Sequence, residues 1–215
     1  MTEYHKIETL YERDETTHRL KHPLVLKNRV YGLVNPWVFT EKIDGTNIRC
    51  IWRDGILTFA GKTDAAQMHP DLVRWLHTHL TPDLMRAAFP TQEDACPVVL
   101  YGEGYGAGIQ KGGGDYSPEK RLILFDVAVY ASPDGPVWWL SDENVRDVGA
   151  KLSLDVVPRI GEMPLAAAAE LVRTGFPSLV GTSGRLAEGV VGRPAEALFD
   201  KKGHRLIVKL KTKDF

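Results

Sequence analysis

The pattern of hydrophobic and polar positions changes at Trp37. The first 36 residues are polar and charged with scattered aromatic side chains, so we expect an irregular or docking arm there rather than a core element. β-Rich runs then follow at 37–40, 48–52 and 56–59. Asp54 and Gly55 separate the last two runs and favour a tight two-residue turn. The sequence therefore predicts one strand followed by a β-hairpin.

Apolar positions recur at helical spacing in the segment after the hairpin. Leu72, Leu76 and Leu80 lie four residues apart and predict the apolar side of a helix that covers a sheet. Further on, Pro164 and Gly175 bracket another helix, because proline favours the first helical turn and glycine the end. We expect helices at 72–80, 82–88, 142–152 and 164–174.

The other apolar runs predict short strands. These runs lie at 98–101, 122–130, 137–140, 189–191 and 205–210. Strands and helices do not repeat as regular βαβ units, which favours a mixed α+β fold built on antiparallel sheets. The sequence has no internal repeat, low-complexity tract or obvious linker, so we expect a single domain over residues 1–215.

The nearly balanced charge of the sequence limits how the protein can bind nucleic acid or another polyanion. Lys and Arg number 27 against 28 Asp and Glu, so any site for a polyanion must be local. The C-terminal stretch is locally basic, and its charges alone fit a solvated strand edge (Lys201, Lys202, His204, Arg205, Lys209, Lys211 and Lys213).

There is no apolar signal run at the N-terminus and no apolar segment long enough to cross a bilayer, so we expect a cytoplasmic protein without a membrane partner.

The two cysteines predict neither a disulfide scaffold nor a structural zinc site. Cys50 and Cys96 are far apart and lack the spacing of metal ligands. We expect both to be buried free thiols.

The most informative run covers residues 41–47 and reads EKIDGTN. It places Lys42 at a strand end beside Glu41 and Asp44 and close to Asn47, immediately before the hairpin. Alone, such a run would fit a salt-bridged strand end. Other short runs follow it in order: GKT at 61–63, YGE at 101–103, LFDV at 124–127, EGVV at 188–191 and VKLK at 208–211.

This ordered set resembles the motif signature of the covalent nucleotidyltransferases, the superfamily of polynucleotide ligases and mRNA capping enzymes. KIDG is similar to the nucleophile motif KxDG, and EKxDGTN is similar to the form found in RNA ligases. At position 62 a lysine stands where the family usually has arginine. Each string is common by chance, but the complete set in order is not. The resemblance implies the ligase adenylation-domain fold, with antiparallel sheets flanked by helices.

The resemblance also implies a role for each motif residue. Lys42 would attack the α-phosphorus of ATP, which requires a neutral amine. Lys209 and Lys211 lie two apart on a strand and share a face, where they would lower the pKa of the nucleophile and bind the α-phosphate. The other expected nucleotide contacts are Glu41 near the base, Phe125 on the purine, Glu103 on the ribose, Lys62 on ribose or phosphate, and Asn47 and Asp126 in support or in later steps. The carboxylates expected to hold Mg²⁺ or Mn²⁺ are Asp44, Glu103 and the catalytic Glu188.

The reaction implied by the resemblance is RNA joining, as in RNA repair. Lys42 forms a phosphoramide with AMP, AMP passes to an RNA 5′-phosphate, and a 3′-hydroxyl displaces AMP and seals the strand. One alternative is an adenylyl- or guanylyltransferase that acts on another acceptor. Another is a non-catalytic module of the same fold that binds nucleotide or nucleic acid, although the intact lysines argue against it.

Two further expectations concern segments around the motifs. The sequence ends shortly after Lys211, where DNA ligases and capping enzymes continue into an OB-fold, so we expect an RNA-ligase-like core for which a partner protein could supply an accessory domain. The glycine-rich segment 106–116 is expected to be a mobile turn, with Lys111 as a candidate phosphate contact.

Overall fold

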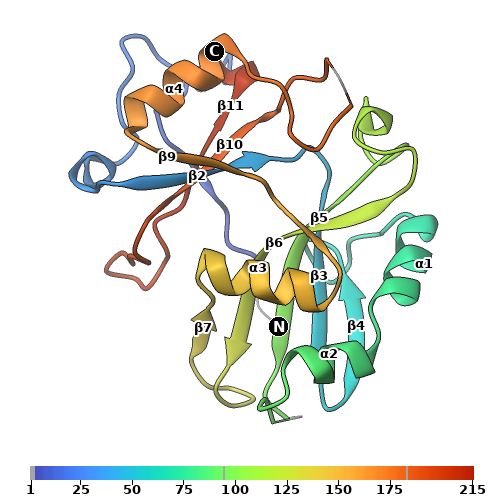
Figure 1. Ribbon diagram of the computed structural model, residues 1–215. Coiled ribbons are helices and arrows are strands. Elements are labelled where there is room, and N and C mark those ends of the chain that lie inside the picture. The colour runs from blue at the N-terminus through green and yellow to red at the C-terminus, as the bar shows by residue number, and fades with distance from the viewer. Residues whose placement is uncertain (1–2, 94, 183) are drawn as a thin grey trace. The chain divides into compact units, whose positions relative to one another are not determined.

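The computed structural model describes residues 3–93, 95–182 and 184–215. The chain divides into two compact units that are interleaved along the sequence (Figure 1). The first unit comprises Asp44–Val157 with Tyr4, and the second comprises His5–Ile43 with Pro158–Phe215. The single-domain organisation expected from the sequence stays a prediction. The α+β class with antiparallel sheets is confirmed.

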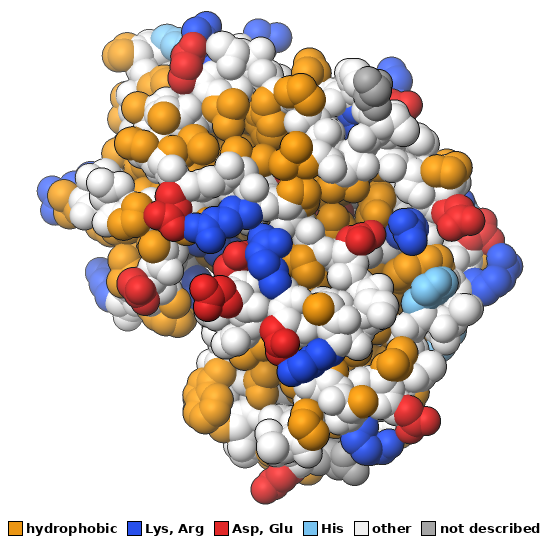
Figure 2. All heavy atoms as spheres, viewed as in Figure 1, with side chains coloured by type: hydrophobic (Ala, Val, Ile, Leu, Met, Phe, Trp, Pro, Cys, Tyr) orange, Lys and Arg blue, Asp and Glu red, His pale blue; other side chains and the backbone are white. Residues whose placement is uncertain are grey.

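The exposed side chains match the nearly balanced charge of the sequence. Figure 2 shows acidic and basic side chains interspersed over the drawn face. None of the helices in the described ranges is both long and apolar enough to cross a bilayer.

The first unit is built on a six-stranded sheet in which β4, β3, β5, β6 and β7 are neighbours in that order and β8 pairs with β6. Its strands are β3 (Thr46–Arg53), β4 (Ile56–Ala60), β5 (Val98–Tyr105), β6 (Arg121–Tyr130), β7 (Val137–Trp139) and β8 (Asp155–Val156). The predicted hairpin is β3–β4, and its turn residues Asp54 and Gly55 both have positive φ, as a type I′ turn requires. A short 3-10 helix, η2 (Gly113–Asp115), lies between β5 and β6.

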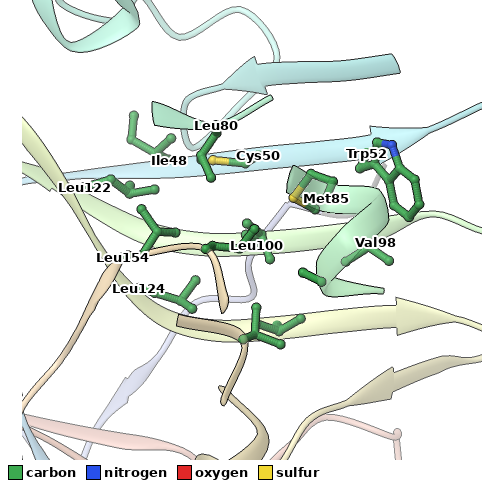
Figure 3. Close-up of a cluster of buried hydrophobic side chains, with 14 of the residues drawn as sticks. Ile48, Cys50, Trp52, Leu80, Met85, Val98, Leu100, Leu122, Leu124 and Leu154 are labelled. Atoms are coloured by element: carbon green, nitrogen blue, oxygen red, sulfur yellow. The ribbon is translucent and has the colours of Figure 1, made fainter. Parts of the chain in front are cut away.

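Helices α1 (Pro70–His79), α2 (Pro82–Ala88) and α3 (Asp142–Lys151) pack on one face of this sheet. The face is apolar because alternate strand residues such as Ile48, Cys50 and Trp52 point toward the helices (Figure 3). Both cysteines are buried free thiols, as predicted. Because the helices occupy this face, the polar motif residues of the unit lie on the opposite face.

The second unit is built on a five-stranded sheet with the order β1, β11, β10, β2 and β9. Its strands are β1 (Glu8–Thr9), β2 (Trp37–Lys42), β9 (Arg159–Met163), β10 (Gly189–Pro194) and β11 (Val208–Lys211). Helix α4 (Leu165–Thr174) packs Ala168 and Val172 against a core that includes Trp37 and Phe39. Short 3-10 helices complete the unit at η1 (Arg29–Leu33) and η3 (Thr212–Asp214).

The prediction for the first 36 residues was wrong in one respect, because the arm is part of the core of the second unit. Leu10, Leu20 and Tyr31 are buried in that core. The arm runs as isolated bridges and turns, so its apolar positions show neither the helical nor the strand period that sequence reasoning looks for. It also adds β1 as a parallel edge strand beside β11, which begins at Val208 and not at 205 as predicted.

Candidate active site

Strand register in the second unit aligns the predicted lysines. Gly189 on β10 pairs with Lys42 on β2 at one side and with Lys211 on β11 at the other. Residues paired across neighbouring strands point to the same face of a sheet. Lys42 and Lys211 therefore flank a glycine in one row, and both project away from the face that carries Phe39 and Leu210.

The carboxylate of Glu188 joins the two lysines of this row. Lys42 Nζ lies 2.6 Å from Glu188 Oε2, and Lys211 Nζ lies 2.6 Å from Oε1. Burial opposes ionisation of Glu188, but the charges and hydrogen bonds of the two lysines hold its pKa below the ordinary value. The result is a partly buried group in which two lysines share one carboxylate.

Gly189 makes this arrangement possible. A Cβ at this position would collide with the carbonyl oxygen of Leu210, and the φ of +154° is one that residues with side chains rarely adopt. A side chain here would also stand between Lys42 and Lys211. The glycine of the EGxV motif is therefore required by packing.

Lys209 occupies the next row of the same face, opposite Val191, whose other neighbour is Thr40. The predicted shared face of Lys209 and Lys211 is confirmed by the register. Burial, followed by repulsion from Lys211, Lys42 and Arg13, lowers the pKa of Lys209 to about 8. An ammonium group in such surroundings is stabilised when an anion binds next to it.

Glu41 points to the opposite, core-facing side of β2. Its carboxylate accepts hydrogen bonds from the Ser178 hydroxyl and from the backbone N–H of Leu179 at 2.8 Å. Burial raises the pKa of Glu41, while these hydrogen bonds and the charge of Arg185 oppose the rise. Glu41 thus holds the segment that begins at Ser178, and its expected place near the base stays a prediction.

In the first unit, several motif residues lie on the sheet face that the helices leave uncovered. Asn47 on β3 pairs with Glu103 on β5, so the two side chains are neighbours on that face. Asn47 Oδ1 is buried and has no hydrogen-bond partner among the described residues. A buried acceptor of this kind fits a site for a hydroxyl donor or a cation.

Asp126 and Phe125 contact Tyr4, a residue near the N-terminus. The Tyr4 hydroxyl donates a hydrogen bond to Asp126 Oδ2 at 2.7 Å, and its ring centroid lies 5.1 Å from that of Phe125 in an edge-on arrangement. Tyr4 also packs on Tyr101 and Trp139. Sequence reasoning missed Tyr4, because nothing near it in the sequence indicates a partner more than a hundred residues away.

Sequence reasoning also missed Arg49. This side chain is completely buried, and it donates from Nε to the carbonyl oxygen of Gly61 at 2.9 Å and from one terminal nitrogen to Asp64 at 2.6 Å. It therefore fixes the loop that carries the exposed Lys62. Arg49 and Asn47 share a face because β3 begins at Thr46, whereas the predicted strand began only at residue 48.

The segment 106–116, expected to be a mobile turn, makes two hydrogen bonds to residues of the nucleophile motif. Its Gln110 donates a side-chain hydrogen bond to the carbonyl oxygen of Gly45 at 3.1 Å, and the hydroxyl of the buried Tyr116 accepts one from the backbone N–H of Asp44 at 3.2 Å. Lys111 is exposed. A Cβ on Gly45 would collide with the carbonyl oxygen of Gly104, so this motif glycine is also required by packing.

The expected metal ligands do not form a preformed cluster. Asp44 and Glu103 belong to the first unit and Glu188 to the second. Across the described ranges, no three His, Cys, Asp or Glu side chains are grouped so that they could hold a metal ion. Their assignment as metal ligands stays a prediction.

A family model described as RNA ligase matches residues 35–211, most of the chain and all of the motifs. The chain belongs to the RNA ligase family. The match begins at residue 35, so it leaves out nearly all of the N-terminal arm. None of the curated proteins matches the chain.

Solved structures of a Naegleria gruberi RNA ligase have the same fold. The form with PPi has a TM-score of 0.63 at 15% identity and covers 98% of this chain and 62% of that chain. A mutant with AMP and Mn has a TM-score of 0.62 at 14% identity and covers 85% and 51%. A mutant with ATP and Mn has a TM-score of 0.61 at 17% identity and covers 95% and 55%. This chain therefore spans about half to three fifths of the length of the ligase that it matches.

Proposed function

We propose that the protein is an ATP-dependent RNA ligase that carries AMP covalently on Lys42. The observation that carries the proposal is the row in which Lys42 and Lys211 share the Glu188 carboxylate at 2.6 Å each, with Lys209 in the next row of the same face. If Glu188 served only to form a structural ion pair, one lysine partner would be enough. Two lysines on one carboxylate, with a third lysine in the next row, suit a nucleophile together with cations for a phosphate.

In the first step, the neutral amine of Lys42 attacks the α-phosphorus of ATP. A bond forms between Nζ and phosphorus, the bond from phosphorus to the bridging oxygen breaks, pyrophosphate leaves, and the amine releases one proton to solvent. Glu188 accepts a hydrogen bond from Nζ and orients it before attack. Lys211 and Lys209 are assigned to neutralise the negative charge that builds on the α-phosphate.

The residues of each unit suit a part of the nucleotide or its metal. On the first unit, the neighbours Asn47 and Glu103 provide a buried acceptor and a carboxylate for ribose hydroxyls or a cation. Phe125 is assigned to the purine, Asp126 to a supporting role, and Lys62 to ribose or phosphate. A divalent metal would screen the phosphate charges during transfer, and Asp44, Glu103 and Glu188 are assigned to it. The Naegleria ligase structures with ATP and Mn support these assignments by analogy of fold.

In the second and third steps, AMP passes to a 5′-phosphate of RNA and a 3′-hydroxyl then displaces it. Family membership supports RNA as the substrate. Because Lys42 is regenerated when AMP leaves, a single lysine serves each round of joining.

The proposal is tested by intact-protein mass spectrometry and a joining assay. Protein cleared of bound AMP is incubated with ATP or GTP and Mg²⁺ or Mn²⁺, and then with nicked and single-stranded RNA. We expect a mass increase of one AMP with ATP, its loss on addition of 5′-phosphorylated RNA, and a joined product. The Lys42→Ala variant should show no mass increase, and Lys151→Ala, an exposed lysine on α3, is the matched control.

Other outcomes identify the alternatives. An adduct that forms with GTP, or that no RNA end discharges, would replace the ligase with a nucleotidyltransferase for another acceptor. If no adduct forms under any condition, the remaining alternative is a non-catalytic binding module of the same fold.

A further inference from the structure

The second unit contains a pocket that the nucleotide assignments do not use. Its volume is about 600 Å³. Among the described residues that line it, all but Lys209 come from the N-terminal arm, between Lys6 and Lys27. The arm reaches this position because β1 lies beside β11, where Thr9 pairs with Lys209 and the backbone N–H of Leu10 bonds to the Lys209 carbonyl oxygen.

Most of the charges that line the pocket are already paired. Lys21 Nζ lies 2.9 Å from Glu12 Oε2, and Lys27 pairs with Glu8. The carboxylate of Asp14 accepts backbone hydrogen bonds from Thr16 and Thr17. Of the remaining acids in the lining, Glu15 is exposed to solvent. Glu8 and Glu12 are therefore each engaged by a lysine, whereas Asp14 and Glu15 have no ion-pair partner among the described residues. Glu8 also lies close enough to Lys6 and Lys209 for their charges to lower its pKa.

Three cationic groups remain without full compensation. Lys6 and Lys209 form no ion pair with any residue in the described ranges. Arg13 pairs through a terminal nitrogen with the buried Asp214, while its Nε is buried and has no partner among the described residues. Arg13 also lies close enough to Lys209 to lower the pKa of that lysine. Cations held near one another in a partly buried pocket favour an anionic ligand.

The ligand chemistry follows from the position of Lys209. This lysine stands in the row next to Lys42 and Lys211, and it also lines the pocket. We propose that the N-terminal arm completes a phosphate-binding pocket in which Lys6, Arg13 and Lys209 bind phosphate groups adjacent to those held at Lys42. The inference rests on the proposed function for the location of Lys42, and the arm lies almost entirely outside the family match.

Two substrates could supply the phosphate, namely the pyrophosphate part of ATP and the 5′-phosphate of RNA. Equilibrium binding separates them without any reaction. Inorganic pyrophosphate is titrated into the AMP-free protein by calorimetry. A 5′-phosphorylated oligoribonucleotide and its 5′-hydroxyl counterpart are titrated in parallel.

The variants are Lys6→Glu, Arg13→Gln and, as a control with the same change of charge as the first, Lys202→Glu. Lys6 and Lys202 are both exposed, and Lys202 lies outside the pocket lining. We expect Lys6→Glu and Arg13→Gln to weaken one of the phosphate ligands about tenfold or more, and Lys202→Glu to leave both unchanged. Weaker pyrophosphate binding assigns the pocket to the nucleotide. Loss of the preference for 5′-phosphorylated over 5′-hydroxyl RNA assigns it to the RNA end.

Unchanged binding of both ligands in Lys6→Glu would overturn the proposal, and so would an equal loss in Lys202→Glu. Arg13→Gln leaves the buried Asp214 unpaired and could unfold the protein. In that case the exposed Lys6→Glu variant still decides the test. Failure here differs from failure of the proposed function. If Lys42 forms the adduct but the variants bind phosphate ligands unchanged, the phosphate-binding pocket is refuted and the ligase proposal stands. If pyrophosphate binding depends on the pocket but no adduct forms, the ligase proposal is refuted and the pocket stands.

Discussion

At the scale of single residues, the candidate site depends on where a side chain is missing as much as on where one is present. Gly189 separates Lys42 from Lys211 across three strands, and Glu188 then reaches both ammonium groups. The same holds for Gly45, because a Cβ at this position would collide with the carbonyl oxygen of Gly104. The glycines of the motifs are therefore explained by steric limits as well as by chemistry.

Substitution of Gly189 tests this account. Gly189→Ala would force β10 and β11 apart at Leu210 and move Lys42 relative to Lys211. We expect the yield of lysyl-AMP to fall about tenfold or more, which corresponds to a change of about 1.4 kcal/mol. Mass spectrometry measures the yield. Gly114→Ala is the control, because a Cβ there makes only ordinary contact with Ala107, and an equal loss in both variants would contradict the account.

The pKa of Lys209 gives a second prediction at this scale. Its folded value of about 8 lies below the ordinary lysine pKa of 10.5, so the side chain is charged below pH 8 and becomes neutral as the pH rises through 8. The charged and titratable groups that affect it are Lys211, Lys42, Arg13 and Glu8.

Competitive acylation at a series of pH values, read by peptide mass spectrometry, measures this pKa. We expect the reactivity of Lys209 to rise with a midpoint near 8, well below the value of about 10.4 for a lysine in a short peptide. Pyrophosphate should move the Lys209 midpoint upward because it stabilises the charged form. A midpoint equal to that of a lysine in a short peptide would contradict the burial and repulsion described for Lys209.

At the scale of secondary-structure elements, predictions from sequence succeeded where periodicity or turn chemistry was strong. The β3–β4 hairpin formed around Asp54 and Gly55, and α4 lies between Pro164 and Gly175 as predicted. The arm was misjudged because its burial depends on contacts with distant strands, including β11. Arg49 and Tyr4 were missed for the same reason, since their partners come from register and tertiary packing.

The core role of the arm predicts a measurable effect on stability. Leu10 is fully buried, so Leu10→Ala removes packed methyl groups and leaves a cavity. We expect the free energy of unfolding in urea to fall by about 2–5 kcal/mol. The control is Leu33→Ala in the same arm, where the side chain is 82% exposed and the change should stay within about 0.5 kcal/mol. Equal stability of the two variants would show that the arm is not a core element.

At the scale of the whole molecule, the motifs that identify the family are distributed between two interleaved units. The second unit holds the lysine row with Glu188, and the first holds Asn47, Glu103 and Phe125. Sequence order alone was enough to recognise the family, because the motifs follow one another from residue 41 to 211. It could not give the sharing of Glu188 by two lysines, which depends on the antiparallel register of β2, β10 and β11.

The central claim is that Lys42 carries AMP, and peptide mapping tests it most directly. Protein incubated with ATP and Mg²⁺ or Mn²⁺ is digested under conditions that preserve phosphoramides, and fragment spectra locate the modified side chain. We predict a single AMP on Lys42, absent from Lys42→Ala and discharged by 5′-phosphorylated RNA. An AMP on Lys209, Lys211 or any other residue, or an adduct that persists in Lys42→Ala, would contradict the account.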